Sequence, residues 1–174
     1  MKTAGFVSEL SKLLTASRQT LALAESCTGG TIGQMISSRP GSSAYFLGGV
    51  VAYHNHIKRA LLGIPNGILK RRGAVSAPVA RAMAENIRLR FKADFAASTT
   101  GIAGPAGGTA KKPVGLVWIA VADRRGCQAR RYVFEGSRSR IRRLAALEAI
   151  SLLSASVRAQ NIPKPRSVCK IKKT

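Results

Sequence analysis

The sequence predicts a layered α/β domain with a mixed β-sheet. Five short apolar runs have the length and composition of strands, and segments with helical apolar spacing precede, separate and follow them. The last two runs flank Asp123-Arg124-Arg125-Gly126, which is typical of a hairpin turn, so one antiparallel pair is expected. Strands that alternate with helices elsewhere favour a layered arrangement around parallel strands. The expected strands cover residues 20–25, 46–53, 93–99, 114–122 and 128–134.

In the N-terminal half, apolar residues at helical spacing predict an amphipathic helix over residues 4–17. A second helix is expected over about 28–38, with Thr28 as its capping residue. Residues 39–42 form a predicted turn. The glycine-bearing run at 46–53 is expected to be a buried strand.

After this strand, two short helical segments are expected on either side of Pro65-Asn66-Gly67. Ser76, with a proline in the first turn after it, starts a longer helix whose apolar residues recur every four positions. That row comprises Val79, Met83, Ile87 and Phe91. A strand then delivers Thr100 to the glycine-rich segment 101–108, which needs a packing or ligand reason to stay ordered. The last helix is expected to begin near Ser137.

The composition fits one globular domain with an unusually basic surface. The chain has 174 residues, 45% of them hydrophobic, and its 29 Lys+Arg residues against 7 Asp+Glu residues give a net charge of +22. Such a charge attracts polyanions, so non-specific, salt-sensitive binding of nucleic acid is one interpretation. The other is a generic solubilising surface, because no interleaved stripe of basic and aromatic residues accompanies the charge.

We expect residues 1–160 to form the domain and residues 161–174 to be a basic, disordered tail, since the tail has no apolar period. No apolar run approaches the length of a membrane span, and the N-terminal stretch is broken by polar residues too early for a signal-peptide core. A cytoplasmic protein without membrane contact is therefore expected.

The strongest local signal lies around Ser26. An apolar run ends there, and small polar residues and two glycines follow before the next helical pattern. A serine at a strand-to-helix junction lies beside helical N–H groups whose partial positive charge favours anions. The junction is thus a candidate for catalysis or phosphate binding. The alternative is an ordinary turn in which Ser26 and Thr28 act only as caps.

Further short motifs follow in order along the chain. They are Ala24-Glu25-Ser26-Cys27-Thr28-Gly29-Gly30, Pro40-Gly41-Ser42-Ser43, Gly48-Gly49-Val50-Val51-Ala52-Tyr53 with Asn55 and Lys58, Gly73-Ala74-Val75-Ser76, Thr100-Gly101-Ile102-Ala103-Gly104-Pro105, Gly107-Gly108-Thr109 and Lys112-Pro113-Val114-Gly115. Together they resemble the CinA C-terminal domain family of nicotinamide-nucleotide amidohydrolases, over about residues 5–158. The combination is far more specific than any one glycine motif.

The resemblance implies a three-layer α/β/α sandwich with a mixed, mostly parallel sheet. It also implies an enzyme of pyridine nucleotide salvage that hydrolyses the carboxamide of nicotinamide mononucleotide, giving nicotinate mononucleotide and ammonia. No cofactor and no metal are expected. A homodimer is expected on the same ground.

Amide hydrolysis needs a nucleophile and a proton shuttle. His54 and His56 are the only histidines and the carboxylates are scattered, so a Ser-His-Asp triad is not expected, although either histidine could line the site. The family's Tyr-x-Asn-x-x-Lys pattern, present as Tyr53, Asn55 and Lys58, implies that Lys58 activates Ser26 and that Tyr53 relays or orients the proton. Without that motif, Lys58 would be interpreted as a surface residue and Tyr53 as core.

Substrate contacts are expected around the nucleophile. Backbone amides of residues 27–30 are expected to form the oxyanion hole. Thr100, grouped with the catalytic residues, would hold Ser26 or the substrate, and the glycine-rich loop would wrap the nucleotide. Either Arg140 or Arg142 would bind the phosphate, and their neighbours Arg138 and Arg143 leave that choice open. The expected substrate-binding residues are Cys27, Thr28, Gly29, Gly30, Asn55, Gly101, Gly104, Arg140 and Arg142.

Three positions depart from the family's usual pattern. Ala106 and Ser137 stand where an acidic residue is expected, and Lys111 stands where Glu is commoner. Altered substrate preference is therefore one hypothesis, including a different small amide. Another is a non-catalytic competence-type protein that keeps the fold and associates with nucleotides or DNA.

Overall fold

The computed structural model describes residues 3–161, and a five-stranded sheet with the order β2-β1-β3-β4-β5 lies at its centre. β1 pairs in parallel with β2 and β3, whereas β4 runs antiparallel to β3 and β5. The strands are β1 (Leu21–Glu25), β2 (Phe46–Val51), β3 (Phe95–Gly101), β4 (Leu116–Asp123) and β5 (Gly126–Val133). The mixed sheet and its hairpin, in which Asp123 pairs with Gly126, are confirmed.

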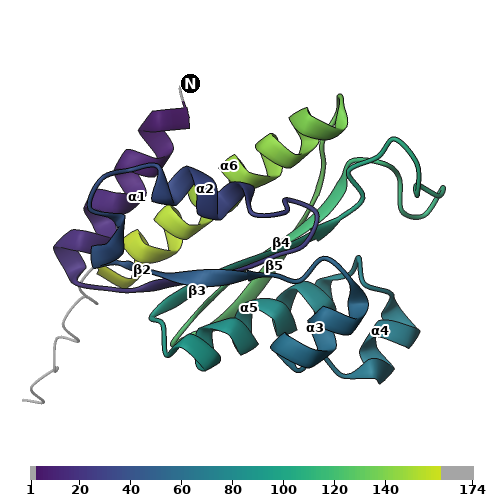
Figure 1. Ribbon diagram of the computed structural model, residues 1–174, viewed down its shortest axis with the longest axis horizontal. Coiled ribbons are helices and arrows are strands. Elements are labelled where there is room, and N and C mark those ends of the chain that lie inside the picture. The colour runs from purple at the N-terminus through teal and green to yellow at the C-terminus, as the bar shows by residue number, and fades with distance from the viewer. Residues whose placement is uncertain (1–2, 162–174) are drawn as a thin grey trace, which may run out of the picture.

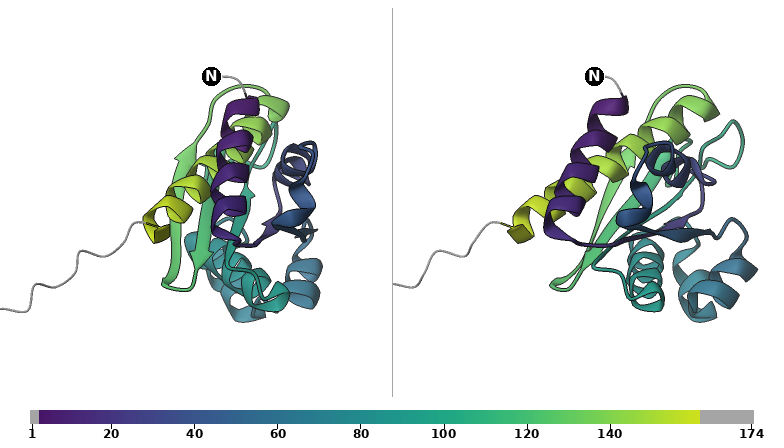
Figure 2. Two further views of the ribbon diagram at one scale, coloured as in Figure 1. Left: turned by 90° about the vertical axis from the view of Figure 1, so that its left-hand side faces the viewer. Right: turned by 60° about the vertical axis from the view of Figure 1, so that its left-hand side comes forward.

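Helices cover both faces of the sheet and complete a three-layer α/β/α sandwich (Figure 1). The helices are α1 (Thr3–Ser17), α2 (Thr31–Ser37), α3 (Asn55–Leu62), α4 (Asn66–Arg72), α5 (Ala77–Phe91) and α6 (Arg138–Asn161), with a short 3-10 helix η1 (Ser42–Ala44) before β2. α1, α2 and α6 lie on one face and α3, α4 and α5 on the other, and Figure 2 shows these layers from two further sides. One apolar cluster lies between the sheet and α1, α2 and α6, and two lie on the other side, where α5 packs.

The helix predicted to start at Ser76 is α5, and its apolar row is the reason that it packs on the sheet. Ser76 is the residue before the helix and a proline lies in the first turn. Val79, Met83 and Ile87 are fully buried, and Phe91 is half-buried against the same apolar cluster. The period of four therefore predicted both the helix and the face that it buries.

β2 is an edge strand, so the prediction that it is buried was wrong. Its residues alternate between half-buried and exposed, and Leu47 and Val51 are 44% and 50% exposed. Strand order is the physical reason, because β2 has β1 as its partner on one side and no strand on the other. β1, with a strand on each side, is buried along its whole length.

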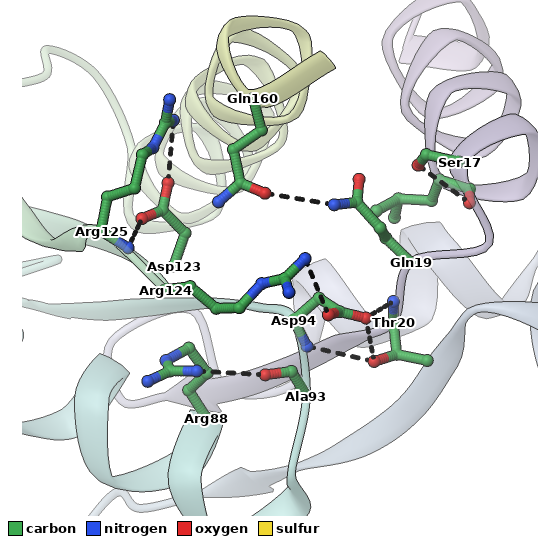
Figure 3. A network of polar contacts seen from close by, with 11 residues as sticks. Ser17, Gln19, Thr20, Arg88, Ala93, Asp94, Asp123, Arg124, Arg125 and Gln160 are labelled. Atoms are coloured by element: carbon green, nitrogen blue, oxygen red, sulfur yellow. Dashed lines mark hydrogen bonds and ion pairs between the residues drawn. The ribbon is translucent and has the colours of Figure 1, made fainter.

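A polar network ties together the end of the sheet where β1 and β3 begin and the β4–β5 hairpin turns (Figure 3). Asp94 accepts hydrogen bonds from the backbone N and the Oγ1 of Thr20 at 2.9 and 3.0 Å. Asp123 accepts from the backbone N and the Nη2 of Arg125 at 2.7 and 3.1 Å. These contacts stabilise the N-terminal ends of β1 and β3. The opposite edge of the sheet, where these strands end, is free for other groups.

That opposite edge carries the C-terminal ends of three neighbouring parallel strands. Glu25 at the end of β1 is in register with Val51 of β2 and Thr99 of β3. The ladder continues one step further, since Ser26 N donates to Thr99 O at 3.0 Å and Ala52 N donates to Glu25 O at 2.8 Å. Open α/β sheets bind ligands at such an edge.

The basic tail expected at 161–174 lies, apart from Asn161 at the end of α6, outside the described residues. In the part of the chain that the structure describes, no helix combines the length and apolar character needed to cross a bilayer.

Candidate active site

Ser26 and Lys58 meet at the C-terminal edge of the sheet. Ser26 directly follows β1, and Lys58 lies in the first half of α3, which begins shortly after β2 ends. Lys58 Nζ lies 3.0 Å from Ser26 Oγ, so the two groups are within proton-transfer distance. Both side chains are buried, and the exposed fraction of Lys58 is only 2%.

The surroundings of Lys58 suit an uncharged amine. Burial lowers the pKa of Lys58 below the usual value of 10.5, and the neighbouring Cys27 opposes this shift only in part. Nζ also donates to the backbone oxygens of Ala52 and Tyr53 at 2.8 and 3.0 Å. A neutral amine has two N–H groups for these carbonyls and one lone pair, which then faces the Ser26 hydroxyl. The geometry therefore fits a base that removes the Ser26 proton.

Cys27 is the nearest competing nucleophile, and its environment makes it inert. Burial raises the pKa of the Cys27 thiol to about 12. The thiolate is the reactive form of cysteine, so the side chain stays protonated and unreactive near neutral pH. Ser26 is thus the nucleophile that this turn offers.

Glu25 holds the turn that carries Ser26. Its carboxylate, 3% exposed, accepts hydrogen bonds from the backbone N–H groups of Gly30, Ile32 and Gly33 at 2.8 to 3.1 Å. These are the amides at the start of α2, so Glu25 satisfies them and occupies the positive end of the helix. The prediction that Thr28 caps this helix was wrong. The Thr28 hydroxyl instead lies 2.7 Å from that of Thr99.

Arg142 of α6 holds the same turn from the other side. Its Nε and Nη2 donate to Thr28 O at 3.2 and 2.8 Å, and Nη2 also donates to Thr31 Oγ1 at 3.2 Å. Gly29 lies beneath it with a φ of 59°, and a Cβ there would be 3.2 Å from Arg142 Nη2. The left-handed φ favours glycine at this position, and a Cβ would also press on the Arg142 guanidinium.

A pocket of about 280 Å³ opens over Ser26 and Lys58. One wall is formed by Ala74 and Val75, which follow α4, and another by the glycine-rich loop after β3. Gly104 is buried in that loop with a φ of 76°, and a Cβ there would be 2.6 Å from Val114 Cγ1. The pocket has the concave shape and few convergent polar groups of a small-molecule site.

Most of the expected site residues line this pocket. Thr100 lines it, but its hydroxyl donates to Ala74 O at 2.9 Å and thereby connects β3 to one wall. The Tyr53 hydroxyl accepts a hydrogen bond from Arg138 at 2.6 Å, and the hydrogen bond between Tyr53 and Lys58 is made by the backbone oxygen of Tyr53. The other expected residues that line the pocket are Cys27, Asn55, Gly101 and Gly104.

The arginine at the pocket is Arg138, which sequence reasoning did not choose. Its Nη1 donates to Gly104 O at 2.8 Å, and the side chain lines the pocket beside Tyr53. Arg140 is exposed and does not line the pocket. The guanidinium of Arg142 is hydrogen-bonded to Thr28 O, in the turn that follows Ser26. Four arginines occur within residues 138–143, and the sequence does not show which one faces the sheet edge.

His54 and His56 are both exposed, and His54 Nδ1 accepts from His56 N at 3.2 Å at the start of α3. They do not line the pocket. Within residues 3–161, no group of three or more His, Cys, Asp and Glu side chains is arranged to hold a metal ion.

A larger cavity of about 660 Å³ lies between the β4–β5 hairpin and the C-terminal part of α6. Its carboxylate, Asp123, already accepts from Arg125 and from Ser156 Oγ. The cavity does not contain a nucleophile paired with a base, so the smaller pocket is the better candidate for chemistry.

The fold and this pocket define an α/β sandwich with a buried Ser–Lys pair at the C-terminal edge of its parallel strands. The sequence profile described as "CinA C-terminal domain" matches residues 4–157. The chain therefore belongs to the CinA C-terminal domain family.

Comparisons with individual proteins agree. The chain is 47% identical over 152 residues to a CinA-like protein of Synechococcus sp. and 51% identical over 144 residues to one of Geobacter metallireducens. These matches cover 86% and 83% of the chain but 36% and 35% of the relatives, so the chain spans about a third of their length.

Solved structures show the same fold. A CinA superfamily protein from Klebsiella pneumoniae matches with a TM-score of 0.88 and 28% identity, covering 91% of this chain and 99% of that one. The competence/damage inducible protein CihA from Agrobacterium tumefaciens matches with a TM-score of 0.79 and 36% identity, covering 88% of this chain and 96% of that one.

Proposed function

We propose that this protein is an amidohydrolase that converts nicotinamide mononucleotide to nicotinate mononucleotide and ammonia. The observation that carries the proposal is the 3.0 Å contact between Ser26 Oγ and a buried Lys58 amine whose pKa is lowered. Serine activated by lysine is an established variant of nucleophilic amide chemistry. The identity of the substrate is inferred from the family resemblance.

In the first half-reaction, neutral Lys58 accepts the Ser26 hydroxyl proton while Oγ forms a bond to the carboxamide carbon. The tetrahedral intermediate collapses when its C–N bond breaks, and Lys58 returns the proton to the departing nitrogen as ammonia forms. In the second half-reaction, Lys58 removes a proton from water, which attacks the ester. The C–Oγ bond then breaks, and Ser26 regains its proton from Lys58.

The developing oxyanion needs N–H donors near Ser26. The Gly29 amide already donates to Ser26 O at 3.1 Å and the Gly30 amide to Glu25, so both are taken. We therefore assign the oxyanion to the amides of Cys27 and Thr28. Glu25 and Arg142 support this role, because they fix the backbone of the turn from both ends.

Arg138 is the best candidate for the substrate's phosphate. It lines the pocket, and a guanidinium matches phosphate oxygens in a bidentate geometry. Tyr53 and Gly104 O hold its two nitrogens in place, which limits the entropy lost on binding. Asn55 lies at the same rim and provides amide groups for the ribose hydroxyls.

The proposal is tested by incubating the purified protein with nicotinamide mononucleotide and measuring ammonia and nicotinate mononucleotide together. Equimolar formation of the two products is expected. Ammonia from other small carboxamides, with none from the nucleotide, would instead identify a different amide as the substrate.

A second candidate function is a non-catalytic protein that binds nucleotides or DNA in a competence-type role. The net charge of +22 and the absence of acidic side chains at positions 106 and 137 favour it. Tight DNA binding at physiological salt, without deamidation of the nucleotide, would support this candidate against the enzyme.

A further inference from the structure

Two segments that are far apart in the sequence carry five basic residues, and each segment adjoins residues that line the pocket. Lys70, Arg71 and Arg72 form the last turn of α4, and Lys111 and Lys112 lie at the end of the glycine-rich loop. We name this set the basic corner. Lys112 connects its two parts, because its Nζ donates to Arg72 O at 3.0 Å.

The loop part of the basic corner is held in a defined turn. Thr109 N donates to Lys112 O at 2.8 Å, and Lys112 N donates back to the backbone oxygen and the Oγ1 of Thr109, both at 3.1 Å. Lys112 Nζ also approaches the C-terminal end of α4, where carbonyl groups favour a cation. The charge of Lys112 therefore has a fixed place next to α4, and Lys111 precedes it in the same turn.

The basic corner lies next to the pocket, because both of its segments are close in sequence to residues that line the pocket walls. Ala74 and Val75, which follow α4, line one side of the pocket, and Ala106 and Gly107, which precede the lysine turn, line another. The hydrogen bond from Lys112 to Arg72 joins these two walls at their outer ends.

Among residues 3–161, no ion pair joins the basic corner to a carboxylate. Residues 26–84 contain no Asp or Glu, and neither do residues 95–122, so both segments of the basic corner and nearly all of the pocket come from acid-free sequence. Glu25 directly precedes the first of these stretches, and its carboxylate already accepts hydrogen bonds from the amides at the start of α2. The ion pairs found within the described residues involve Arg124, Arg125 and Arg158, not the corner.

We propose that the basic corner selects phosphate-bearing substrates by drawing them to the pocket mouth. A cluster of like charges beside a narrow opening focuses the potential and raises the local concentration of anions. This inference rests on the proposed amidohydrolase activity and adds residues that act on capture of the substrate, not on the chemical step.

The test compares nicotinamide mononucleotide with nicotinamide riboside, which has the same carboxamide and no phosphate. The double variant Lys70→Gln, Lys111→Gln removes two exposed charges that do not line the pocket. The matched control, Lys12→Gln with Lys92→Gln, removes the same charge from α1 and from the residue after α5. At low salt we expect the corner variant to lower kcat/KM for the mononucleotide by about threefold to tenfold, mainly through KM.

Three further results are expected. The riboside should be unaffected by the corner variant, the control should change neither substrate by as much as twofold, and high salt should reduce the difference between the variants. Equal losses for both substrates, or no loss for the mononucleotide, would overturn the inference.

A wild-type protein that deamidates neither substrate would refute the proposed function. Anion binding by the basic corner is then tested by a separate measurement. Calorimetric titration with inorganic pyrophosphate then decides, because affinity must fall in the corner variant and not in the control. Equal affinity in the two variants would overturn the inference without reference to any activity.

Discussion

The protonation state of Lys58 decides whether Ser26 can react. A charged ammonium would donate to Ser26 Oγ and leave it no base, whereas a neutral amine can accept its proton. Burial favours the neutral form, because a charge at a side chain that is 2% exposed loses nearly all of its hydration. The proposed roles of nucleophile and base therefore depend on where the pair lies, not on its residue types alone.

The pH dependence of the activity should follow this lysine. We expect kcat/KM to rise with pH along a single ionisation whose pKa lies below 10.5, because Lys58 acts in its deprotonated form. Lys58→Arg should abolish activity at every pH, since a guanidinium stays charged. Lys12→Arg, a like change at an exposed lysine of α1, serves as the control and should leave the profile unchanged.

The lowered pKa of Lys58 also predicts the direction in which the free energy of unfolding changes with pH. Between the folded-state pKa of Lys58 and 10.5, the unfolded chain binds more protons than the folded one. The contribution of Lys58 to the free energy of unfolding must therefore rise with pH in that window and level off above it. Chemical denaturation at several pH values, compared between wild type and Lys58→Met, measures this contribution.

The turn between β1 and α2 is the element that places Ser26, and two charged side chains hold it. Arg142 donates to Thr28 O and Glu25 accepts from α2 amides, so the turn is fixed to α6 on one side and to α2 on the other. Preorganisation of this kind lowers the entropic cost of reaching the reactive geometry.

Arg142 should consequently affect kcat and not KM. In Arg142→Met we expect kcat to fall about tenfold or more, because the nucleophile and oxyanion amides lose their fixed position, while KM for the nucleotide changes little. Arg140→Met provides the matched control on the same helix and should resemble the wild type, since Arg140 does not line the pocket. A large rise in KM with kcat intact would assign Arg142 to the phosphate instead.

Local sequence patterns predicted most elements, because their signals come from neighbouring residues. The apolar row of α5 and the turn residues of the β4–β5 hairpin are examples. The edge position of β2 depends on strand order, which is set by contacts distant in sequence, and no local pattern encodes it.

The site residues also divide into those that the local sequence predicts and those that depend on how distant elements pack. Ser26 could be singled out from its junction, but Lys58 could be chosen only through the family motif, because its spacing alone indicates a surface lysine. The capping role of Glu25 and the pocket position of Arg138 depend on how distant elements pack. Side-chain direction at those positions follows from tertiary structure, which the chain pattern does not specify.

At the scale of the whole molecule, the two edges of the sheet differ in charge. Residues 40–57, which include the edge strand β2, contain no Lys, Arg, Asp or Glu, whereas β5 at the other edge carries Arg130 and Arg131. Two copies that each carry +22 repel one another, and the local repulsion is smallest where the facing surfaces have no charged side chains. The β2 edge, with exposed Leu47 and Val51, is therefore where the expected homodimer should form.

Light scattering with size-exclusion chromatography checks this expectation. Leu47→Arg with Val51→Arg should convert a dimer to a monomer, because it places cations on both sides of the contact. Val133→Arg, at a residue of similar exposure on β5, should leave the dimer intact. A wild-type monomer at micromolar concentration, or dissociation by the β5 variant alone, would contradict the assignment.

The central claim is that Ser26 attacks the substrate, and one comparison tests it most directly. Ammonia release from nicotinamide mononucleotide should be measured side by side for wild type, Ser26→Ala and the surface control Ser38→Ala. We predict a loss of at least about 10³-fold in Ser26→Ala, since the variant removes the hydroxyl 3.0 Å from Lys58 Nζ and burial keeps the Cys27 thiol protonated, and a wild-type rate in the control. A folded Ser26→Ala protein that releases ammonia as fast as the wild type would contradict the account.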